Sequence, residues 1–346
     1  MRNLRQIDDG GAPRADGTRR DPRLRAGAMW ARRGGRTILS TGVALLFSIS
    51  CAHGRGAHSA STDVLASGKL EHGGRMRTYR YHLPKRDPGG LLPLVLAIHG
   101  RLGDGAKMEQ LAGFAPVSDR EGFLVVYPEG IDRSWNDDRG GTPASAQNVD
   151  DVGFIDALIE KFVRDHRADP ARVYAIGISN GGFFAQRLAC RLANRLAAVV
   201  SVVATVPRVL PERCTPGRPV PIAFFLGTDD GFVPYKGGTV RGDAGGATMS
   251  AEDSARFWAR LNGCDDKPER TDDAGRGAAD GTRVSKQLFR GCKGQGDVVL
   301  FTIEGGGHTW PGGWQYLPKM VVGRTTGRLS ATEQAWDFFR GHRRMQ

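Results

Sequence analysis

A serine lies between two glycines in the segment Gly177-Ile178-Ser179-Asn180-Gly181, at the point where an apolar run gives way to a helical pattern. The pattern G-x-S-x-G is typical of a strand that turns sharply into a helix and exposes the serine as a nucleophile. A serine can equally cap a helix, and in a chain with 49 Gly the pentapeptide arises easily by chance. The strand-like segment before Ser179 and the amphipathic segment after it favour the nucleophile.

A serine hydroxyl needs a base to take its proton and an acid to orient that base. In chains with this motif the partners follow in the order Ser, then Asp or Glu, then His. Two histidines follow Ser179. His342 ends the last helical pattern, where a solvated role is expected, so His308, in a glycine-rich loop, is the candidate base. Asp229 and Asp230 both follow an apolar segment and both could be turn formers, so the acid stays open at this point.

The oxyanion of an acyl-transfer intermediate needs backbone donors, normally the N–H after the nucleophile and one from a loop after an early strand. Asn180 supplies the first. Arg101 or Leu102, which follow His99-Gly100 at the end of an apolar run, supplies the second. His99 is interpreted as a structural residue that fixes this loop.

Apolar segments and helical patterns alternate along the chain, which predicts an α/β fold with a mostly parallel central sheet flanked by helices in a single catalytic domain. Strands are expected at residues 78–83, 94–98, 123–127, 173–178, 197–204, 222–226 and 298–303. Helices are expected at residues 107–121, 152–167, 180–194, 251–261 and 331–341. Residues 267–282 are expected to form a solvated loop.

The N-terminal part differs in character from the rest. Residues 1–36 hold ten Arg and four Asp and so carry half of the formal net charge of +12. A basic start at Met29, an apolar run at residues 37–49 and small residues around Cys51 predict a signal peptide. We therefore expect a leader at residues 1–52, a tether at 53–67 and the catalytic domain at 68–346. Met29 is an alternative start, and Cys51 is an alternative site of lipidation that would tether the protein to a membrane.

Beyond the leader the chain has four cysteines, an even number in a protein expected to be exported. Pairing by proximity gives Cys190–Cys214 and Cys264–Cys292, and the alternative is four free thiols. No cysteine or histidine spacing suits a metal, so neither a metal nor a cofactor is expected. The remaining Arg residues are dispersed and not interleaved with aromatics, so no nucleic-acid partner is expected.

Taken in order, several segments resemble the secreted poly(3-hydroxybutyrate) depolymerase and feruloyl esterase family of α/β-hydrolases. They are "LVLAIHG", "VVYPEG" followed by "SWND", "NVDDVGFI", "AIGISNGGFFAQRLAC", "FFLGTDDGFVPY", "NGC" and "GGGHTWPGG". The family's acid, in the fourth position of Gly-x-x-Asp-x-x-Val-Pro, falls on Asp230. The resemblance also implies both cysteine pairs and a structural role for Asp150 and Asp151 beside the active site.

The chain departs from the family in two places. A cysteine-rich segment that many relatives have after "SWN" is replaced by "DDRGGTPASAQ", and Arg101 stands where small or sulfur-bearing residues are common. Three tryptophans near the expected site, Trp135, Trp310 and Trp314, could form an apolar wall for the substrate, with Trp310 the strongest candidate and loop packing the alternative.

These observations predict a secreted or periplasmic serine esterase. In the alternative in which Cys51 is acylated, the protein would be anchored to a membrane by lipid. It would hydrolyse poly(3-hydroxybutyrate)-type oligoesters or feruloyl- and acetyl-type esters through an acyl-enzyme. One alternative is an acyltransferase with the same Ser-Asp-His triad. Another, from a different class, is a non-catalytic envelope or binding protein.

Overall fold

The computed structural model describes residues 65–346 except residues 87, 243–244, 273–274, 276–278 and 345–346. These residues fall within the unit Thr62–Gln346. The expected leader, with Met29 and Cys51, lies outside the described residues, as does the expected tether up to residue 64. Among the described residues, no helix combines the length and the apolar character needed to cross a bilayer.

Six parallel strands form the centre of a ten-stranded sheet. They are β3 (Leu92–Ile98), β4 (Leu124–Pro128), β5 (Ala168–Ile178), β6 (Ala198–Val202), β7 (Ile222–Gly227) and β12 (Val298–Glu304). Because both faces of a parallel sheet are covered, its strands are nearly continuous apolar runs. Every residue of β3 is buried, for example. This is why the central strands were recognisable in the sequence.

Antiparallel strands extend the sheet at both edges. β1 (Ala66–His72) pairs with β2 (Arg75–His82), which joins β4, while β11 (Arg283–Phe289) joins β12 and β10 (Glu269–Thr271) forms the far edge. Three of these strands were not expected. β1 begins inside the expected tether, and β10 lies in the expected solvated loop, with all its residues exposed. The three unexpected strands contain several polar residues each, so they lack the continuous apolar run that marks the centre.

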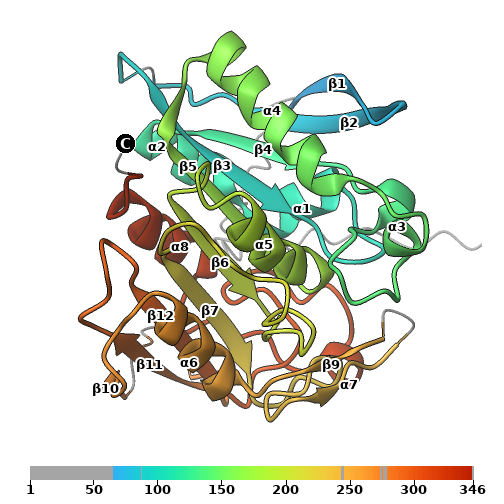
Figure 1. Cartoon of the computed structure of the whole chain (residues 1–346). Helices are drawn as coiled ribbons and strands as arrows, with labels where there is room; N and C mark the ends of the chain where they lie inside the picture. The colour runs from blue at the N-terminus through green and yellow to red at the C-terminus, as the bar shows by residue number, and fades with distance from the viewer. Residues whose placement is uncertain (1–64, 87, 243–244, 273–274, 276–278, 345–346) are drawn as a thin grey trace, which may run out of the picture. The chain divides into compact units, whose positions relative to one another are not determined.

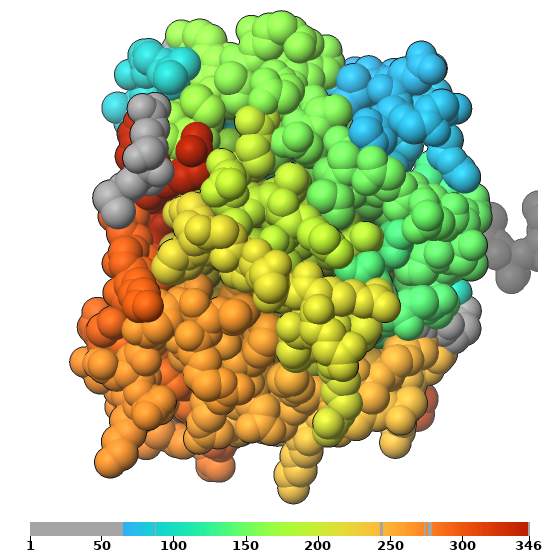
Figure 2. All heavy atoms as spheres, viewed as in Figure 1, coloured from blue at the N-terminus to red at the C-terminus, as the bar shows by residue number. Residues whose placement is uncertain are grey.

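Helices cover both faces of the sheet (Figure 1). α4 (Asp151–His166), α5 (Asn180–Arg191) and α6 (Ala251–Leu261) share a core with alternate β3 residues such as Leu94. α1 (Gly105–Ala112), α2 (Phe114–Glu121) and α8 (Ala331–Arg340) pack with the other β3 residues, such as Val95. The period of two in a strand sends neighbouring side chains into opposite cores. The space-filling view shows side chains covering the strands on the α4–α6 face (Figure 2).

The expected helix at residues 107–121 is two helices, α1 (Gly105–Ala112) and α2 (Phe114–Glu121). Gly113 separates them in the left-handed conformation, with φ 60°, and its N–H closes α1 on the carbonyl of Glu109. Pro116 falls in the first turn of α2, where a missing N–H needs no acceptor inside the helix. Gly113 and Pro116 were the sequence indications of this break.

The strand order is β1-β2-β4-β3-β5-β6-β7-β12-β11-β10. With helices on both faces, this is an α/β-hydrolase fold, as predicted. Loops at the carboxyl ends of parallel strands meet at one edge of the sheet and build its sites. Here the loops after β3, β5, β7 and β12 carry Arg101, Ser179, Asp230 and His308, respectively. The minor elements of the described chain are η1 (Ile131–Arg133), α3 (Pro143–Ala146), β8 (Gly238–Thr239), β9 (Ala247–Thr248) and α7 (Lys319–Val322).

The described part of the chain contains two disulfides, and both have the expected pairing. Cys190, in the last turn of α5, is joined to Cys214 in the connection between β6 and β7. Cys264, after α6, is joined to Cys292, which follows β11. Each bridge therefore ties a helix of the α4–α6 face to a connecting segment.

Candidate active site

Ser179 occupies the sharp turn between β5 and α5. Its backbone has φ 56° and ψ −121°, a conformation that non-glycine residues rarely adopt. The Ser179 N–H donates to the carbonyl of Val202, 2.9 Å away, and its side chain makes no capping hydrogen bond to α5. The hydroxyl is therefore not used as a helix cap. Such strained residues cluster at functional sites.

The glycines on either side of Ser179 are required by space. A Cβ on Gly177 would lie 2.2 Å from the carbonyl oxygen of Gly181, and a Cβ on Gly181 would lie 2.4 Å from that of Ile98. Both contacts involve backbone atoms, which cannot move away as a flexible side chain can. The first turn of α5 thus packs directly against the end of β3.

His308 and Asp230 form a buried pair. The Nδ1–H of His308 donates to Oδ2 of Asp230 at 2.8 Å. The other carboxylate oxygen of Asp230 accepts the backbone N–H groups of Phe232 and Val233, at 2.8 and 2.9 Å. Because a carboxylate only accepts, the proton of a neutral His308 lies on Nδ1 and leaves Nε2 as an acceptor. Asp229, the competing acid, is exposed.

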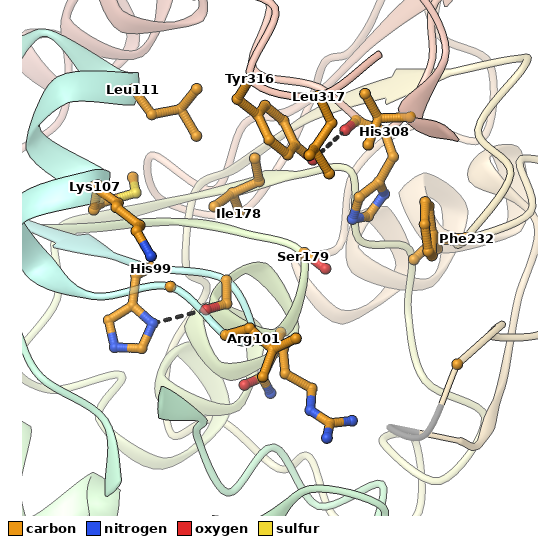
Figure 3. A pocket seen from close by; sticks show the side chains of 18 of the residues that line it. His99, Arg101, Lys107, Leu111, Ile178, Ser179, Phe232, His308, Tyr316 and Leu317 are labelled. Atoms are coloured by element: carbon orange, nitrogen blue, oxygen red, sulfur yellow. Dashed lines mark hydrogen bonds between the residues drawn. The ribbon is translucent and has the colours of Figure 1, made fainter. Parts of the chain in front are cut away.

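The backbone of His308 is held by the segment that follows it. The Tyr316 hydroxyl donates to the His308 carbonyl at 2.7 Å, as Figure 3 shows, and the His308 N–H donates to Val322 at 2.5 Å. Phe232 packs beside the ring, with centroids 5.2 Å apart. Ser179 and His308 line the same cavity, and no hydrogen bond joins their side chains within the part of the chain that the structure describes.

Of the three expected oxyanion donors, Leu102 does not suit the role. Its N–H already donates to the carbonyl of Arg133 at 2.9 Å. Arg101 lines the cavity and follows Gly100, where an added Cβ would lie 3.4 Å from the Cβ of Ser179. Asn180 is the first residue of α5, where backbone N–H groups have no acceptor inside the helix.

His99 fixes the loop that carries Arg101. Its Nδ1–H donates to the carbonyl of Gly100 at 2.8 Å (Figure 3). Its Nε2 accepts the N–H of Gly130 at 3.0 Å. Burial lowers the pKa of His99 to about 4, so the ring is neutral at neutral pH. Both ring nitrogens are occupied by backbone, which fits the expected structural role.

The side chain of Asn180 ties α5 to the segment that departs from the family pattern. Its Oδ1 accepts the N–H of Trp135 at 2.8 Å, and its Nδ2 donates to Asp137 at 2.6 Å. Asp137 is also paired with Arg139 at 2.7 Å, and both side chains are buried. The Arg139 guanidinium lies over the Phe183 ring, 3.8 Å from its centroid. Asp137 and Arg139 were not identified from the sequence, because nothing local links them to Ser179. Phe183 follows Ser179 by four residues, but its place in the cavity lining depends on tertiary structure.

A cavity of about 610 Å³ opens beside Ser179. Its apolar lining includes Ile178, Phe183, Phe232, Val233 and Val240. Trp314 and Leu317 lie at its rim and remain 54% and 44% exposed. Figure 3 shows Lys107 on one side of Ser179, and His308 and Phe232 on the other.

Two of the three tryptophans considered for substrate contact, Trp310 and Trp135, are core residues instead. Trp310 is 1% exposed, packs on Phe114 and donates its indole N–H to Thr332 at 3.0 Å. Trp135 is fully buried and donates its indole N–H to the carbonyl of His99 at 3.0 Å. Neither lines the cavity, whereas Trp314, rated lower from the sequence, does.

Three further expectations concern residues near the site or the last helix. Asp150 caps α4 by accepting the N–H of Gly153 at 2.9 Å, and Asp151 is buried in an ion pair with Arg77 at 2.7 Å, so both have structural contacts.

The solvated role expected for His342 is wrong. Its side chain is buried and lies 2.7 Å from the carbonyl of Phe338.

Residues 77–207 match the family model described as "Esterase PHB depolymerase". The chain is 33% identical over 280 residues to "Putative esterase NocK" of Nocardia uniformis subsp. tsuyamanensis, covering 78% of this chain and 80% of that protein. It is 28% identical over 241 residues to "Feruloyl esterase B" of Piromyces equi, covering 66% of this chain and 42% of that protein.

Among solved structures, the acetyl xylan esterase from Aspergillus awamori is similar in fold. The TM-score is 0.54 at 14% identity, over 80% of this chain and 99% of that one. At this identity the likeness concerns the arrangement of helices and strands.

Proposed function

Because the chain belongs to the esterase PHB depolymerase family and is a carboxylic ester hydrolase, we propose that it works as a serine esterase through an acyl-enzyme on Ser179. One observation carries the proposal: a strained serine at the β5–α5 turn lines one cavity with His308, whose ring is bonded to the buried Asp230. The three residues come from three loops at the carboxyl edge of the sheet, in the chain order that this turn requires.

In the first half-reaction, Ser179 Oγ attacks the carbonyl carbon of the ester while its proton passes to His308 Nε2. Asp230, bonded to Nδ1–H, stabilises the imidazolium and keeps the ring oriented. The tetrahedral intermediate then expels the alcohol oxygen, which takes the proton from His308. The acyl group remains on Ser179. Because such contacts often tighten only when substrate is bound, we expect the Ser179–His308 hydrogen bond to form in the complex.

In the second half-reaction, a water molecule gives its proton to His308 and attacks the acyl carbon. Collapse of this intermediate breaks the bond to Ser179, whose oxygen recovers the proton. The carboxylic acid leaves, and the enzyme returns to its starting state.

We assign the oxyanion donors to the backbone N–H groups of Asn180 and Arg101. Asn180 directly follows Ser179, and Arg101 follows Gly100, which packs against Ser179. Leu102 is excluded because its N–H donates to the carbonyl of Arg133. Donors of this kind contribute about 10²- to 10³-fold to kcat each. The His99 hydrogen bonds and the Asn180 side-chain bonds would hold these two backbone segments in place.

The proposed substrates are feruloyl- or acetyl-type esters or oligoesters of 3-hydroxybutyrate. We also propose that the catalytic domain, at residues 68–346, follows a leader at 1–52 and a tether at 53–67, and that the enzyme is exported. The two disulfides support export, because such bonds persist in oxidising compartments.

A fluorophosphonate probe tests the nucleophile. The wild-type protein should be labelled and should cleave p-nitrophenyl butyrate, whereas Ser179→Ala should not be labelled. Ser179→Ala and His308→Ala should each lower kcat about 10⁴-fold or more. Ser67→Ala, which removes an exposed hydroxyl on β1, is the matched control and should behave as wild type. Labelling that persists in Ser179→Ala would refute the assignment.

A further inference from the structure

The charges around the cavity are unbalanced. Four cationic side chains line it: Arg101, Lys107, Arg139 and Arg241. No Asp or Glu lines it among the residues that the structure describes. Hydrolysis of a neutral ester needs oxyanion donors, here backbone N–H groups, but it does not itself need positive side chains. The excess of positive charge around the cavity therefore calls for a reason in the substrate.

Two of the four cations have carboxylate partners behind the lining. Arg139 is paired with buried Asp137, and Lys107 lies 3.4 Å from Asp104. Arg241 is exposed and forms no ion pair with any described residue, while Asp243, two residues further on, lies outside the described residues. Arg101 is only partly exposed, so Arg241 is the lining cation best placed to meet an anion from solution.

Most of the remaining lining is apolar. Phe183, Val233 and Val240 line the cavity together with Arg241, which directly follows Val240. An apolar wall beside a guanidinium suits a ligand with an apolar body and an anionic end. An arginine is also well suited to this end of a ligand, because its planar guanidinium can bind a carboxylate through two hydrogen bonds.

We propose that the enzyme prefers esters that carry a carboxylate on the acyl or the alcohol part, and that Arg241 binds this carboxylate. The proposal rests on the serine esterase function proposed above and names its substrate class. The attraction acts through a solvent-exposed residue, so it should weaken as salt screens it.

The experiment uses two pairs of esters that differ only in carboxylate against carboxamide. 4-Nitrophenyl hydrogen glutarate and its carboxamide carry the difference on the acyl part. 4-Butyryloxybenzoate and 4-butyryloxybenzamide carry it on the alcohol part. Rates measured with Ser179→Ala are subtracted, because the glutarate can hydrolyse spontaneously. p-Nitrophenyl butyrate serves as the reference substrate.

In at least one pair, we expect kcat/KM to be about fivefold higher for the carboxylate at low ionic strength, and the advantage to shrink in 0.5 M salt. The pair that shows it identifies the part of the substrate that carries the anion. Arg241→Gln should remove most of the advantage. Arg283→Gln removes the same charge from a side chain that is 81% exposed and paired with Glu304 away from the cavity lining, so it should keep the wild-type ratio.

The proposal is overturned if both pairs are cleaved and neither carboxylate is preferred, or if Arg241→Gln and Arg283→Gln give the same ratio. Either result leaves the serine esterase function intact. If the wild type fails to cleave p-nitrophenyl butyrate, the function itself is refuted, and the substrate preference with it.

Discussion

At Ser179 the backbone is held in a conformation that costs about 1–3 kcal/mol. Its neighbours maintain it, because the Ser179 N–H is bonded to Val202 and Gly181 packs on the end of β3. A serine that served only as a helix cap would need neither feature. The conformation therefore supports the nucleophile interpretation more strongly than the pentapeptide alone does.

His99 should make the protein less stable in mild acid. Burial lowers the pKa of His99 in the folded state to about 4, from an ordinary value of 6.5. As the pH falls below 6.5, the unfolded chain binds a proton that the folded chain does not bind until about pH 4. The stability linked to His99 is therefore complete above pH 6.5 and declines below it. At pH 5 the loss should be about 2 kcal/mol.

Urea unfolding of wild type and His99→Gln at pH 8 and pH 5 measures this effect. The wild type should lose about 2 kcal/mol more than the variant between the two pH values. Comparing the change within each protein removes the other titrating groups, which both proteins share. Equal losses in the two proteins would contradict the assignment of a buried, neutral His99.

Residue types and their order in the chain were enough to nominate Ser179 and His308, and the resemblance to the family selected Asp230 over Asp229. They could not decide which tryptophan faces the cavity, because Trp310 and Trp314 lie four residues apart in one loop and differ in what packs around them. Nor could they show that the Leu102 N–H is used by Arg133, a contact between distant segments. Such errors concern side-chain direction and backbone pairing, which depend on tertiary structure.

Among the elements, the segment between η1 and α3 stabilises the start of α5. It carries Asp137, whose buried carboxylate binds both Arg139 and the side chain of Asn180. Removing it with Asp137→Ala leaves a buried guanidinium without its partner, so the free energy of unfolding should fall by about 3–5 kcal/mol. Denaturant unfolding at neutral pH measures the loss.

The control is Asp337→Ala, which breaks an exposed pair with Arg340 on α8 and should cost less than about 1 kcal/mol. In Asp137→Ala/Arg139→Met the unpaired charge is gone, so part of the lost stability should return. If Asp137→Ala costs no more than Asp337→Ala, the segment does not stabilise α5 in this way.

The more deeply a strand is buried, the more readily it could be predicted from the sequence. The six parallel strands are apolar on both faces and were found, although their ends shifted by a few residues. β1 and β10, which form the two edges of the sheet, and β11, which lies beside β10, were missed because polar residues interrupt their apolar runs. The break at Gly113 was missed because the apolar periodicity continues from α1 into α2, which pack in the same core.

At the scale of the whole molecule, the disulfides should stabilise the fold but take no part in ester hydrolysis. The bridges close loops with sequence separations of 24 and 28 residues, and each should stabilise the fold by about 3 kcal/mol through the unfolded state. Neither cystine lines the cavity. Cys190→Ser/Cys214→Ser and Cys264→Ser/Cys292→Ser should therefore each unfold at lower denaturant concentration while they keep wild-type kcat at 25 °C.

The reduced wild type, which lacks both bridges, is the control for the substitutions themselves. The reduced protein should be less stable than either variant. A variant that unfolds with wild-type stability would show that its bridge does not constrain the unfolded chain, and a large fall in kcat would show that the bridge shapes the active site.

The contact between Gly181 and the carbonyl of Ile98 involves backbone on both sides. The spacing between Ser179 and the loop after β3 is thus independent of the side chains that line the cavity. Those side chains can be exchanged, by evolution or in the laboratory, while the reacting geometry stays the same. The protein is accordingly a suitable scaffold for redesigning ester selectivity, provided that Gly177 and Gly181 are kept.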